Sequence, residues 1–396
     1  MLETQLETAA PEITGADEGD ALLPVYAHMP FEPVAGDGVT LTTRDGRTLL
    51  DLYGGHAVAL LGYNHPRLVA ALAAQARTLF FQSNVVPLAV RARAARRLLG
   101  FAPPGLTRAF LVNSGAEANE NALRLALRAT GRSRVVALEG AFHGRTAAAA
   151  AVSHGSGKWY GFPRAPFDVT FVPRGDLAAL EAALGDLGGA AALIVEPVQG
   201  MAGAVDLGAD YLAAARDLTR RAGARLLFDE VQCGMGRTGH PFAAQAYGVT
   251  PDILTTAKGL AGGFPAGALL VNDEIARSVH TGDLGTTFGG GPLACALIEA
   301  VIEAIEVENL LANVRTLSRR LRESCQVGPV TAIQGEGFLL GLRTTRPAKE
   351  IQAELLARGF VTGGSADPHV VRLLPPLVLT ATHVDALARA LAEIRP

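Results

Sequence analysis

Two residues in the middle of the chain have the types and spacing for chemistry at one shared cleft. Asp229 follows a short apolar run at residues 226–228, and Lys258 lies just past a second run at residues 253–256. Short apolar runs bounded by glycine and proline are typical of buried strands. An acid at the end of one strand and a lysine just after the next can therefore face the same cavity.

A pyridine cofactor needs both of these groups. A lysine forms a Schiff base with pyridoxal phosphate (PLP), and a carboxylate keeps the ring nitrogen protonated so that the ring accepts electrons. Each residue alone has a plainer interpretation, because an acid at a strand end is commonly a cap and a lysine is commonly solvated. The chemistry is favoured only if the rest of the chain supplies the other parts of such a site.

The composition is that of a globular chain with room for two domains, since 49% of the 396 residues are apolar. The net charge of −3, with lysine and arginine spread along the chain, does not indicate a nucleic acid or a membrane as partner. The three cysteines and nine histidines show no metal-type spacing, and an odd cysteine count disfavours a disulfide framework. We therefore expect no metal and a cytoplasmic location.

The chain is expected to divide into four segments. Residues 1–20 carry acids but no lysine or arginine, which is typical of a mobile tail and not of a signal peptide. Residues 21–60 form an N-terminal segment that packs with a small domain. Residues 61–290 form the large domain, and residues 291–396 form the small α+β domain at the C-terminus.

Apolar runs alternate with helical stretches from about residue 108, which predicts a mostly parallel sheet wrapped by helices. The strand candidates are 109–112, 135–138, 169–172, 192–195, 226–228, 253–255 and 268–271. Ligands bind such sheets at the carboxyl ends of the strands. Several polar residues fall at or just after these ends, namely Asn113, Ser114, Glu139, Glu196, Asp229, Glu230 and Lys258.

Other residues suit an anion or an aromatic ring. The stretch NSGAEAN at 113–119 follows a strand and opens a helix, where free N–H groups bind phosphate, although Ser114 alone fits a plain N-cap. Phe142 suits stacking on a ring, with core packing as the alternative. Arg145 suits a carboxylate or a surface ion pair. Arg372 lies in an apolar run, where arginine is rare without a partner, so the position suits a carboxylate ligand.

Two glycine-rich stretches do not meet the requirements of nucleotide-binding motifs. Residues 234–239 match G-x-G-x-x-G after a strand, but His240 and Pro241 follow, so no helix opens there and we predict a loop. The Gly157-Lys158 pair lacks the earlier glycine and the following serine or threonine of a P-loop.

In combination, these motifs resemble those of the class-III, PLP-dependent aminotransferases of fold type I, and most closely the acetylornithine and succinylornithine aminotransferases. The resemblance spans about residues 25–376, with the motifs NSGAEANE (113–120), FHGRT (142–146), EPVQG (196–200), DEVQCGMGRTG (229–239), PDILTTAKG (251–259) and TTFGGGPLACA (286–296). It implies an α/β fold in which a large PLP-binding domain holds a mostly parallel seven-stranded sheet and a smaller α+β domain follows.

The resemblance also implies roles for the matching residues. Lys258 carries PLP and moves the proton, and Asp229 pairs with the pyridine nitrogen. Phe142 stacks on the ring, and Gln232 bonds its hydroxyl group. The other implied cofactor-binding residues are Ser114, Gly115 and Ala116 at the phosphate, together with His143, Glu196, Val231 and Thr286.

The implied reaction needs substrate residues and a second subunit. Arg145 and Arg372 hold substrate carboxylates, and Tyr26 lines the substrate entrance. Thr287 reaches the phosphate of the neighbouring subunit, which implies a homodimer with shared sites. The reaction moves the δ-amine of N2-acetylornithine or N2-succinylornithine to 2-oxoglutarate, in arginine biosynthesis, and yields the N-acylglutamate semialdehyde and glutamate. Burial should lower the pKa of Lys258, which suits a base near neutral pH.

One departure from the family's pattern bears on the substrate. After EPVQG the family usually has a glutamate that pairs with the second arginine while the diamine substrate is bound, and this chain has Met201. Because Met201 cannot form that pair, we expect Arg372 to stay free for a carboxylate on the acyl group, which favours N-succinylornithine. Gly291 and Cys233 also depart from the pattern, and they leave the substrate less narrowly defined.

Other functions stay open at this point. A different class-III enzyme would act on ornithine, 4-aminobutyrate or an acyl-lysine, and a PLP aminomutase or racemase would use the same scaffold. Two substrate arginines favour transamination, because glutamate and 2-oxoglutarate each bring two carboxylates. A protein that only binds a nucleotide or phosphate at the helix of Ser114 would leave Asp229, Lys258 and Phe142 without a role.

Overall fold

The computed structural model describes residues 14–396. Most of the predicted tail, residues 1–13, lies outside the described residues. The rest of it contains a 3₁₀ turn, η1 (Gly15–Asp17), and the start of a one-turn helix, α1 (Glu18–Ala21). The mobility of the tail, and the division of the chain after residues 20, 60 and 290, stay predictions.

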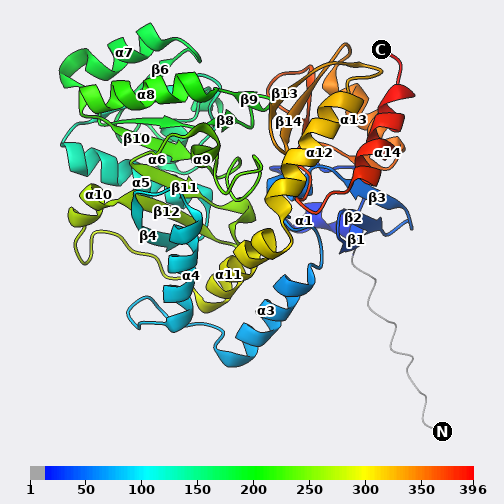
Figure 1. Ribbon diagram of the computed structural model, residues 1–396, viewed down its shortest axis with the longest axis horizontal. Helices are drawn as coiled ribbons and strands as arrows, with labels where there is room; N and C mark the ends of the chain where they lie inside the picture. The colour runs from blue at the N-terminus through cyan, green and yellow to red at the C-terminus, as the bar shows by residue number, and fades with distance from the viewer. Residues whose placement is uncertain (1–13) are drawn as a thin grey trace.

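A seven-stranded sheet with the order β4-β12-β11-β10-β7-β5-β6 is the centre of the larger body (Figure 1). Its pairs are parallel except the two that involve β12, so six strands run in one direction. All seven predicted strands are present, and the predicted fold class is confirmed. Their bounds are β4 (Leu106–Val112), β5 (Arg134–Leu138), β6 (Asp168–Val172), β7 (Ala192–Val195), β10 (Arg225–Asp229), β11 (Ile253–Thr256) and β12 (Gly267–Asn272).

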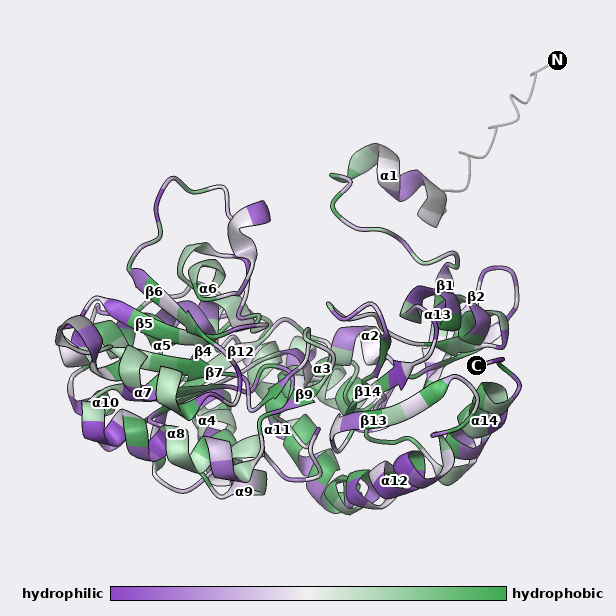
Figure 2. Ribbon diagram, turned by 90° about the horizontal axis from the view of Figure 1, so that it is seen from above, coloured by the Kyte–Doolittle hydropathy of each residue, from purple (hydrophilic) through white to green (hydrophobic). Residues whose placement is uncertain are grey.

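Helices cover both faces of this sheet (Figure 2), which explains why its strands are continuous apolar runs and not alternating ones. Val135 and Ala137 of β5 pack on the side of α5, whereas Val136 and Leu138 pack on the side of α7 and α8. The helices around the sheet are α4 (Ala89–Phe101), α5 (Gly115–Thr130), α6 (Ala147–Ala151), α7 (Leu177–Gly185), α8 (Ala209–Ala222), α9 (Ala243–Tyr247) and α10 (Asp273–Arg277).

The smaller body is built from segments near both ends of the described chain. Strands β1 (Pro33–Asp37), β2 (Thr40–Thr43) and β3 (Thr48–Asp51) form one sheet with β15 (Phe360–Val361), and β3 pairs with β15 in parallel. A second, antiparallel sheet holds β13 (Val330–Glu336), β14 (Leu339–Thr344) and β16 (Val370–Leu373). The helices of this part of the chain are α12 (Leu310–Ser324), α13 (Ala348–Ala357) and α14 (Ala381–Ala392).

A long helix, α11 (Pro292–Val307), packs against α3 (Pro66–Thr78) and α4 beneath both bodies (Figure 1). Within residues 14–396 no helix has the length and apolar character needed to cross a membrane. The remaining short elements are α2 (Gly54–Ala57), β8 (Val198–Gln199), β9 (Val205–Asp206), η2 (Ser156–Lys158), η3 (Asp186–Gly188) and η4 (Lys258–Ala261).

The glycine-rich segment 234–239 is a series of turns, and the next helix begins only at Ala243, so the predicted loop is confirmed. Glu230 anchors this loop, because its buried carboxylate accepts hydrogen bonds from the backbone N–H groups of Ala243 and Ala244. The end of β10 is thereby tied to the start of α9.

Candidate active site

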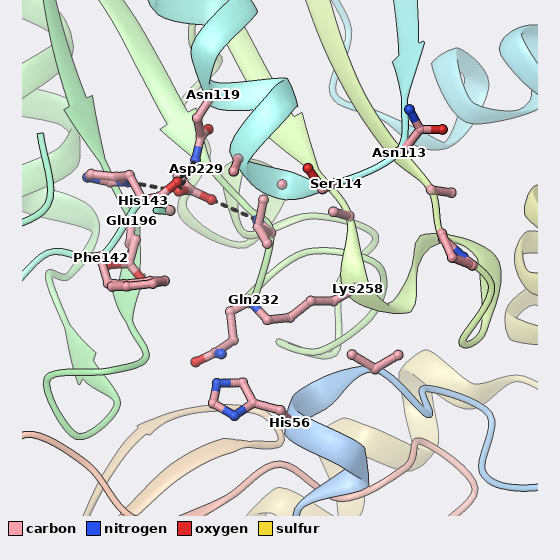
Figure 3. Close-up of a pocket in the computed structure, with 18 of the residues that line it drawn as sticks. His56, Asn113, Ser114, Asn119, Phe142, His143, Glu196, Asp229, Gln232 and Lys258 are labelled. Atoms are coloured by element: carbon pink, nitrogen blue, oxygen red, sulfur yellow. Dashed lines mark hydrogen bonds and ion pairs between the residues drawn. The ribbon is translucent and has the colours of Figure 1, made fainter. Parts of the chain in front are cut away.

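A cavity of ≈ 330 Å³ lies at the carboxyl ends of the central strands. Among the residues predicted from sequence, those that line it are Ser114, Gly115, Ala116, Phe142, His143, Glu196, Met201, Asp229, Val231, Gln232 and Lys258. They come from the segments after β4, β5, β7, β10 and β11, as the convergence of strand ends predicts. The opposite wall includes His56 from α2 (Figure 3).

The carboxylate of Asp229 is buried and held from three sides (Figure 3). Its Oδ2 accepts from Asn119 Nδ2 at 2.7 Å and lies 2.8 Å from His143 Nδ1, and its Oδ1 accepts from Val231 N at 3.0 Å. Asn119 also donates to the His143 carbonyl at 2.8 Å and accepts from Thr255 Oγ1 at 2.7 Å. These bonds connect α5, β10, β11 and the loop after β5, so the orientation of the carboxylate depends on all four.

Lys258 begins the 3₁₀ helix η4 directly after β11 and has a φ of 47°. This left-handed conformation is strained for a residue with a side chain, and such strain is concentrated at functional sites. Burial lowers the pKa of Lys258, and the charge of Arg372 lowers it further, while Asp229 and Glu196 raise it. Within residues 14–396 no acceptor lies at hydrogen-bond distance from its amine. The lowered pKa increases the fraction of free, nucleophilic amine at neutral pH.

The first turn of α5 has two donors to spare. Ser114 is its N-cap, because its Oγ accepts from Glu117 N at 3.2 Å and its carbonyl accepts from Ala118 N at 3.1 Å. The N–H groups of Gly115 and Ala116 have no acceptor in the described part of the chain, and both residues line the cavity. Ser114 is thus a cap, and the two N–H groups after it are available for an anion.

Glu196 holds the segment that carries Phe142 against the cavity. One of its carboxylate oxygens accepts from Phe142 N at 2.9 Å and the other from Gly200 N at 3.2 Å. Burial raises the pKa of Glu196 to about 7. A side chain at Gly200 would place its Cβ 1.5 Å from Gln232 Oε1, so glycine is required there for Gln232 to occupy its position.

Arg372, only 1% exposed, is surrounded by neutral acceptors. Its guanidinium donates to Gln232 Oε1 at 3.2 Å, to Tyr53 Oη at 3.1 Å and to the carbonyl of Gly364. No carboxylate of the described residues forms an ion pair with it. Burial lowers the pKa of Arg372. A guanidinium that is buried without an acid is suited to an incoming anion.

His56 continues this network to the cavity wall. Tyr53 Oη accepts from Arg372 and lies at hydrogen-bond distance, 2.5 Å, from His56 Nδ1. Burial, followed by the charges of Arg372, Lys258 and Arg145, lowers the pKa of His56 to about 4. His56 is therefore neutral at physiological pH, with its ring edge at the cavity (Figure 3).

Five predicted residues do not line the cavity. Tyr26 is 72% exposed, and Thr287 is exposed on the surface. Thr286 Oγ1 accepts from Asn113 Nδ2 at 3.3 Å and from Gly289 N at 3.1 Å. Arg145 lies beside the cavity with its guanidinium over the Phe142 ring, and Arg372 lies behind Gln232.

Sequence reasoning assigned no role to Asn119, His56 or Tyr53. Asn119 lies within the NSGAEANE motif, which was the only local signal for it. His56 and Tyr53 flank Gly54 and Gly55, and all residues from Gly54 to Ala57 have positive φ. A glycine pair predicts a loop, but it does not predict which wall of a cavity the loop will form.

The chain belongs to the class-III aminotransferases, because the family model described as Aminotransferase class-III matches residues 24–394. It is 41% identical over 374 residues to the acetylornithine aminotransferase of Mycobacterium tuberculosis (strain ATCC 25618 / H37Rv), covering 93% of this chain and 92% of the relative. It is 43% identical over 389 residues to that of Streptomyces coelicolor, covering 97% and 95%.

Solved structures agree with this assignment. The acetylornithine aminotransferase from Elizabethkingia anophelis matches with a TM-score of 0.84 and 28% identity, covering 96% of this chain and 98% of that one. The ornithine aminotransferase from Toxoplasma gondii ME49 matches with a TM-score of 0.88 and 28% identity, covering 96% and 93%. The predicted family and the predicted enzyme class, a PLP-dependent aminotransferase, are confirmed.

We expect Lys258 to be carbamylated by cyanate at lower pH than the exposed Lys158 and Lys349, because its lowered pKa leaves more free amine at a given pH. Cofactor-free protein is labelled across a series from about pH 6 to about pH 10, and peptide mass spectrometry gives the midpoint for each lysine. Limited access of cyanate to a buried lysine slows its labelling at every pH but does not move the midpoint. The midpoints, and not the rates, are therefore compared. A midpoint for Lys258 equal to or above those of the two exposed lysines would contradict the lowered pKa.

Proposed function

We propose that this chain uses PLP to transfer the δ-amine of an N-acylornithine to 2-oxoglutarate, with the N-acylglutamate semialdehyde and glutamate as products. One observation carries the proposal: buried Lys258, with a lowered pKa and no acceptor of its own among residues 14–396, shares a cavity with buried Asp229 and the N-terminus of α5. Acetylornithine aminotransferases that are 38–43% identical to most of the chain support the substrate class.

The residues around the cavity fit PLP. The free N–H groups of Gly115 and Ala116, with Ser114, would hold its phosphate, and the helix dipole of α5 favours that charge. Asp229 would face the ring nitrogen, and Phe142 would cover the ring. Further predicted contacts are His143, Glu196, Val231 and Thr286. When bound, the cofactor supplies an electron sink for the charge left by a departing substrate proton.

Each protein group then has a task in the reaction. Lys258 would hold the cofactor and, once displaced by the substrate amine, would take the proton from the carbon that carries this amine. Its lowered pKa keeps the amine able to accept that proton near neutral pH. Asn119 and His143 hold Asp229 in place, and Gln232 keeps its amide donor for the ring hydroxyl because Arg372 occupies only its oxygen.

The positive groups beside the cavity suit substrates with carboxylates. Arg145 and Arg372 would each bind one, and 2-oxoglutarate and glutamate bring two. After burial, the charges of both arginines contribute to the lowered pKa of His56, so both act on a residue of the cavity wall. The names of the acetylornithine aminotransferase relatives support a place in arginine biosynthesis. Tyr26 at the substrate entrance and the cytoplasmic location stay predictions.

A homodimer with shared sites is part of the proposal. Thr287 is exposed beside Phe288, and the Phe288 ring contacts that of Phe81 at 5.6 Å between centroids. The neighbouring loop adds large apolar side chains that are exposed in the single chain, namely Leu79, Phe80, Val85 and Val86. An apolar patch of this kind commonly marks a protein interface, and a second copy on it would bring Thr287 toward the partner's cofactor.

We expect the purified protein to be yellow, and borohydride to bleach this colour by fixing the cofactor to Lys258. Lys258→Ala should lower 2-oxoglutarate-dependent turnover of N-acetylornithine by roughly 100- to 10,000-fold, the range typical of a lost acid–base group. Absorption spectroscopy and a glutamate-release assay measure both effects. Lys349→Ala, which removes an exposed lysine, is the matched control and should leave both unchanged. A wild-type protein that stays colourless after incubation with PLP would refute the proposal.

The acyl group can be tested at Met201. The name of the relatives favours acetyl, whereas an Arg372 without a carboxylate partner among residues 14–396 favours succinyl. We expect Met201→Glu to lower the ratio of kcat/KM for N-succinylornithine to that for N-acetylornithine by about tenfold, because the introduced carboxylate would compete for Arg372. Met201→Gln, of similar size but uncharged, should leave the ratio near that of the wild type. A clear wild-type preference for the acetyl compound would contradict the succinyl hypothesis.

The proposed dimer can be tested at Phe288, which is 67% exposed. We expect Phe288→Asp to shift the mass in solution from twice 41.1 kDa toward 41.1 kDa and to reduce activity, because Thr287 would lose the partner site. Light scattering coupled to size exclusion measures the mass. Val307→Asp changes an exposed valine outside the patch and is the control. A wild-type protein that is monomeric and fully active would rule out shared sites.

A further inference from the structure

Aromatic rings, and not an acid, hold the guanidinium of Arg145. Its Cζ lies 5.4 Å from the centroid of the Phe142 ring and 5.8 Å from that of the Trp159 ring. The two rings are 6.4 Å apart and tilted by 51°. Within residues 14–396 the guanidinium makes no hydrogen bond or ion pair. All N–H donors of Arg145 are therefore unused by the described residues.

The two rings come from different segments. Phe142 precedes Arg145 in the loop after β5, where Glu196 fixes its backbone N–H. Trp159 follows η2 in the segment between α6 and β6, and it is 42% exposed. Its backbone N–H donates to the Ser156 carbonyl at 2.9 Å, which closes the turn that carries it. The indole therefore reaches Arg145 from a segment separate from the one that carries Phe142.

This arrangement suits an arginine that must wait for an anion. A cation over ring faces gains electrostatic stabilisation without using its N–H groups, which lie in the guanidinium plane and remain available to a carboxylate. An acid in the same place would compete with the substrate for Arg145. Arginine without such support has many rotamers, and ordering it on binding lowers affinity.

We propose that Trp159 is a positioning residue that, together with Phe142, holds Arg145 in place to receive a substrate carboxylate. The proposal rests on the proposed function in one respect, namely that Arg145 binds the carboxylate of the N-acylornithine. Trp159 itself does not touch the reacting atoms. Its effect should therefore appear in the recognition of the carboxylate and not in the chemistry at the amine.

The kinetic test compares two substrates that differ only in this carboxylate, N-acetylornithine and N-acetylputrescine. We expect Trp159→Leu to lower kcat/KM for N-acetylornithine about three- to fivefold, mainly through KM, as the loss of one exposed cation–π contact implies. The value for N-acetylputrescine should not change. Trp159→Phe, which keeps a ring face, should restore most of the loss.

A matched control lies in the same segment. Phe162 is also an exposed aromatic, at 55%, and it packs on Tyr160 and not on Arg145. Phe162→Leu should leave kcat/KM for both substrates unchanged. Equal losses for both substrates in Trp159→Leu, or the same selective loss in Phe162→Leu, would overturn the proposal, because either would mean a general role of the segment.

A second readout does not depend on turnover. Trp159 is the single tryptophan of the chain, so fluorescence excited beyond the absorption of tyrosine reports on this stack alone. We expect N-acetylnorvaline, which is N-acetylornithine without its δ-amine, to change the fluorescence of the PLP-loaded protein in a saturable way. Arg145→Gln should abolish this change. If the wild type shows no change, or Arg145→Gln retains it, the proposal is wrong.

The two proposals fail in different ways. A wild-type protein with no activity toward any N-acylornithine would refute the proposed function, while the fluorescence titration would still decide whether the stack responds to a carboxylate. An active wild type whose selectivity is unaffected by Trp159→Leu would refute only the role of Trp159.

Discussion

The buried carboxylate of Asp229 is the constraint on which the rest of the site depends. A charge in the interior is costly unless hydrogen bonds satisfy it, and Asn119, His143 and the backbone of Val231 do so here. Those donors come from α5 and from the loops after β5 and β10, so the strands and the helix must be in register for the carboxylate to be tolerated. The first turn of α5, with its free N–H groups, is positioned by the same contacts.

Among the described residues, the cations of the site are not paired with its acids, so they remain available to an incoming anion. Lys258 has no hydrogen-bond acceptor among residues 14–396, Arg372 has neutral acceptors, and Arg145 has ring faces. The buried acids Asp229 and Glu196 are saturated mostly by backbone and neutral donors and do not pair with these cations. Cations without acid partners can bind an anionic group without breaking an internal ion pair.

The seven strands of the large sheet could be predicted because both of its faces are covered, which makes each strand a continuous apolar run. The helical stretches between these strands were likewise predicted, and they include α5 and α8. Elements such as β15 and β8 were not, since two residues carry no periodicity. They are strands only because a partner lies beside them, as β3 does for β15.

The sequence by itself determined the enzyme family, the strand ends that carry the functional residues, and the placement of Asp229 and Lys258 at one cavity. These follow from local motifs and from the rule that parallel strands present their carboxyl ends at one edge. Only the tertiary structure decided how those residues are supported: Asn119 beneath Asp229, Tyr53 and His56 beside Arg372, and Trp159 over Arg145. Such contacts join segments far apart in the chain, and their energies depend on distance and direction, which residue type and spacing do not encode.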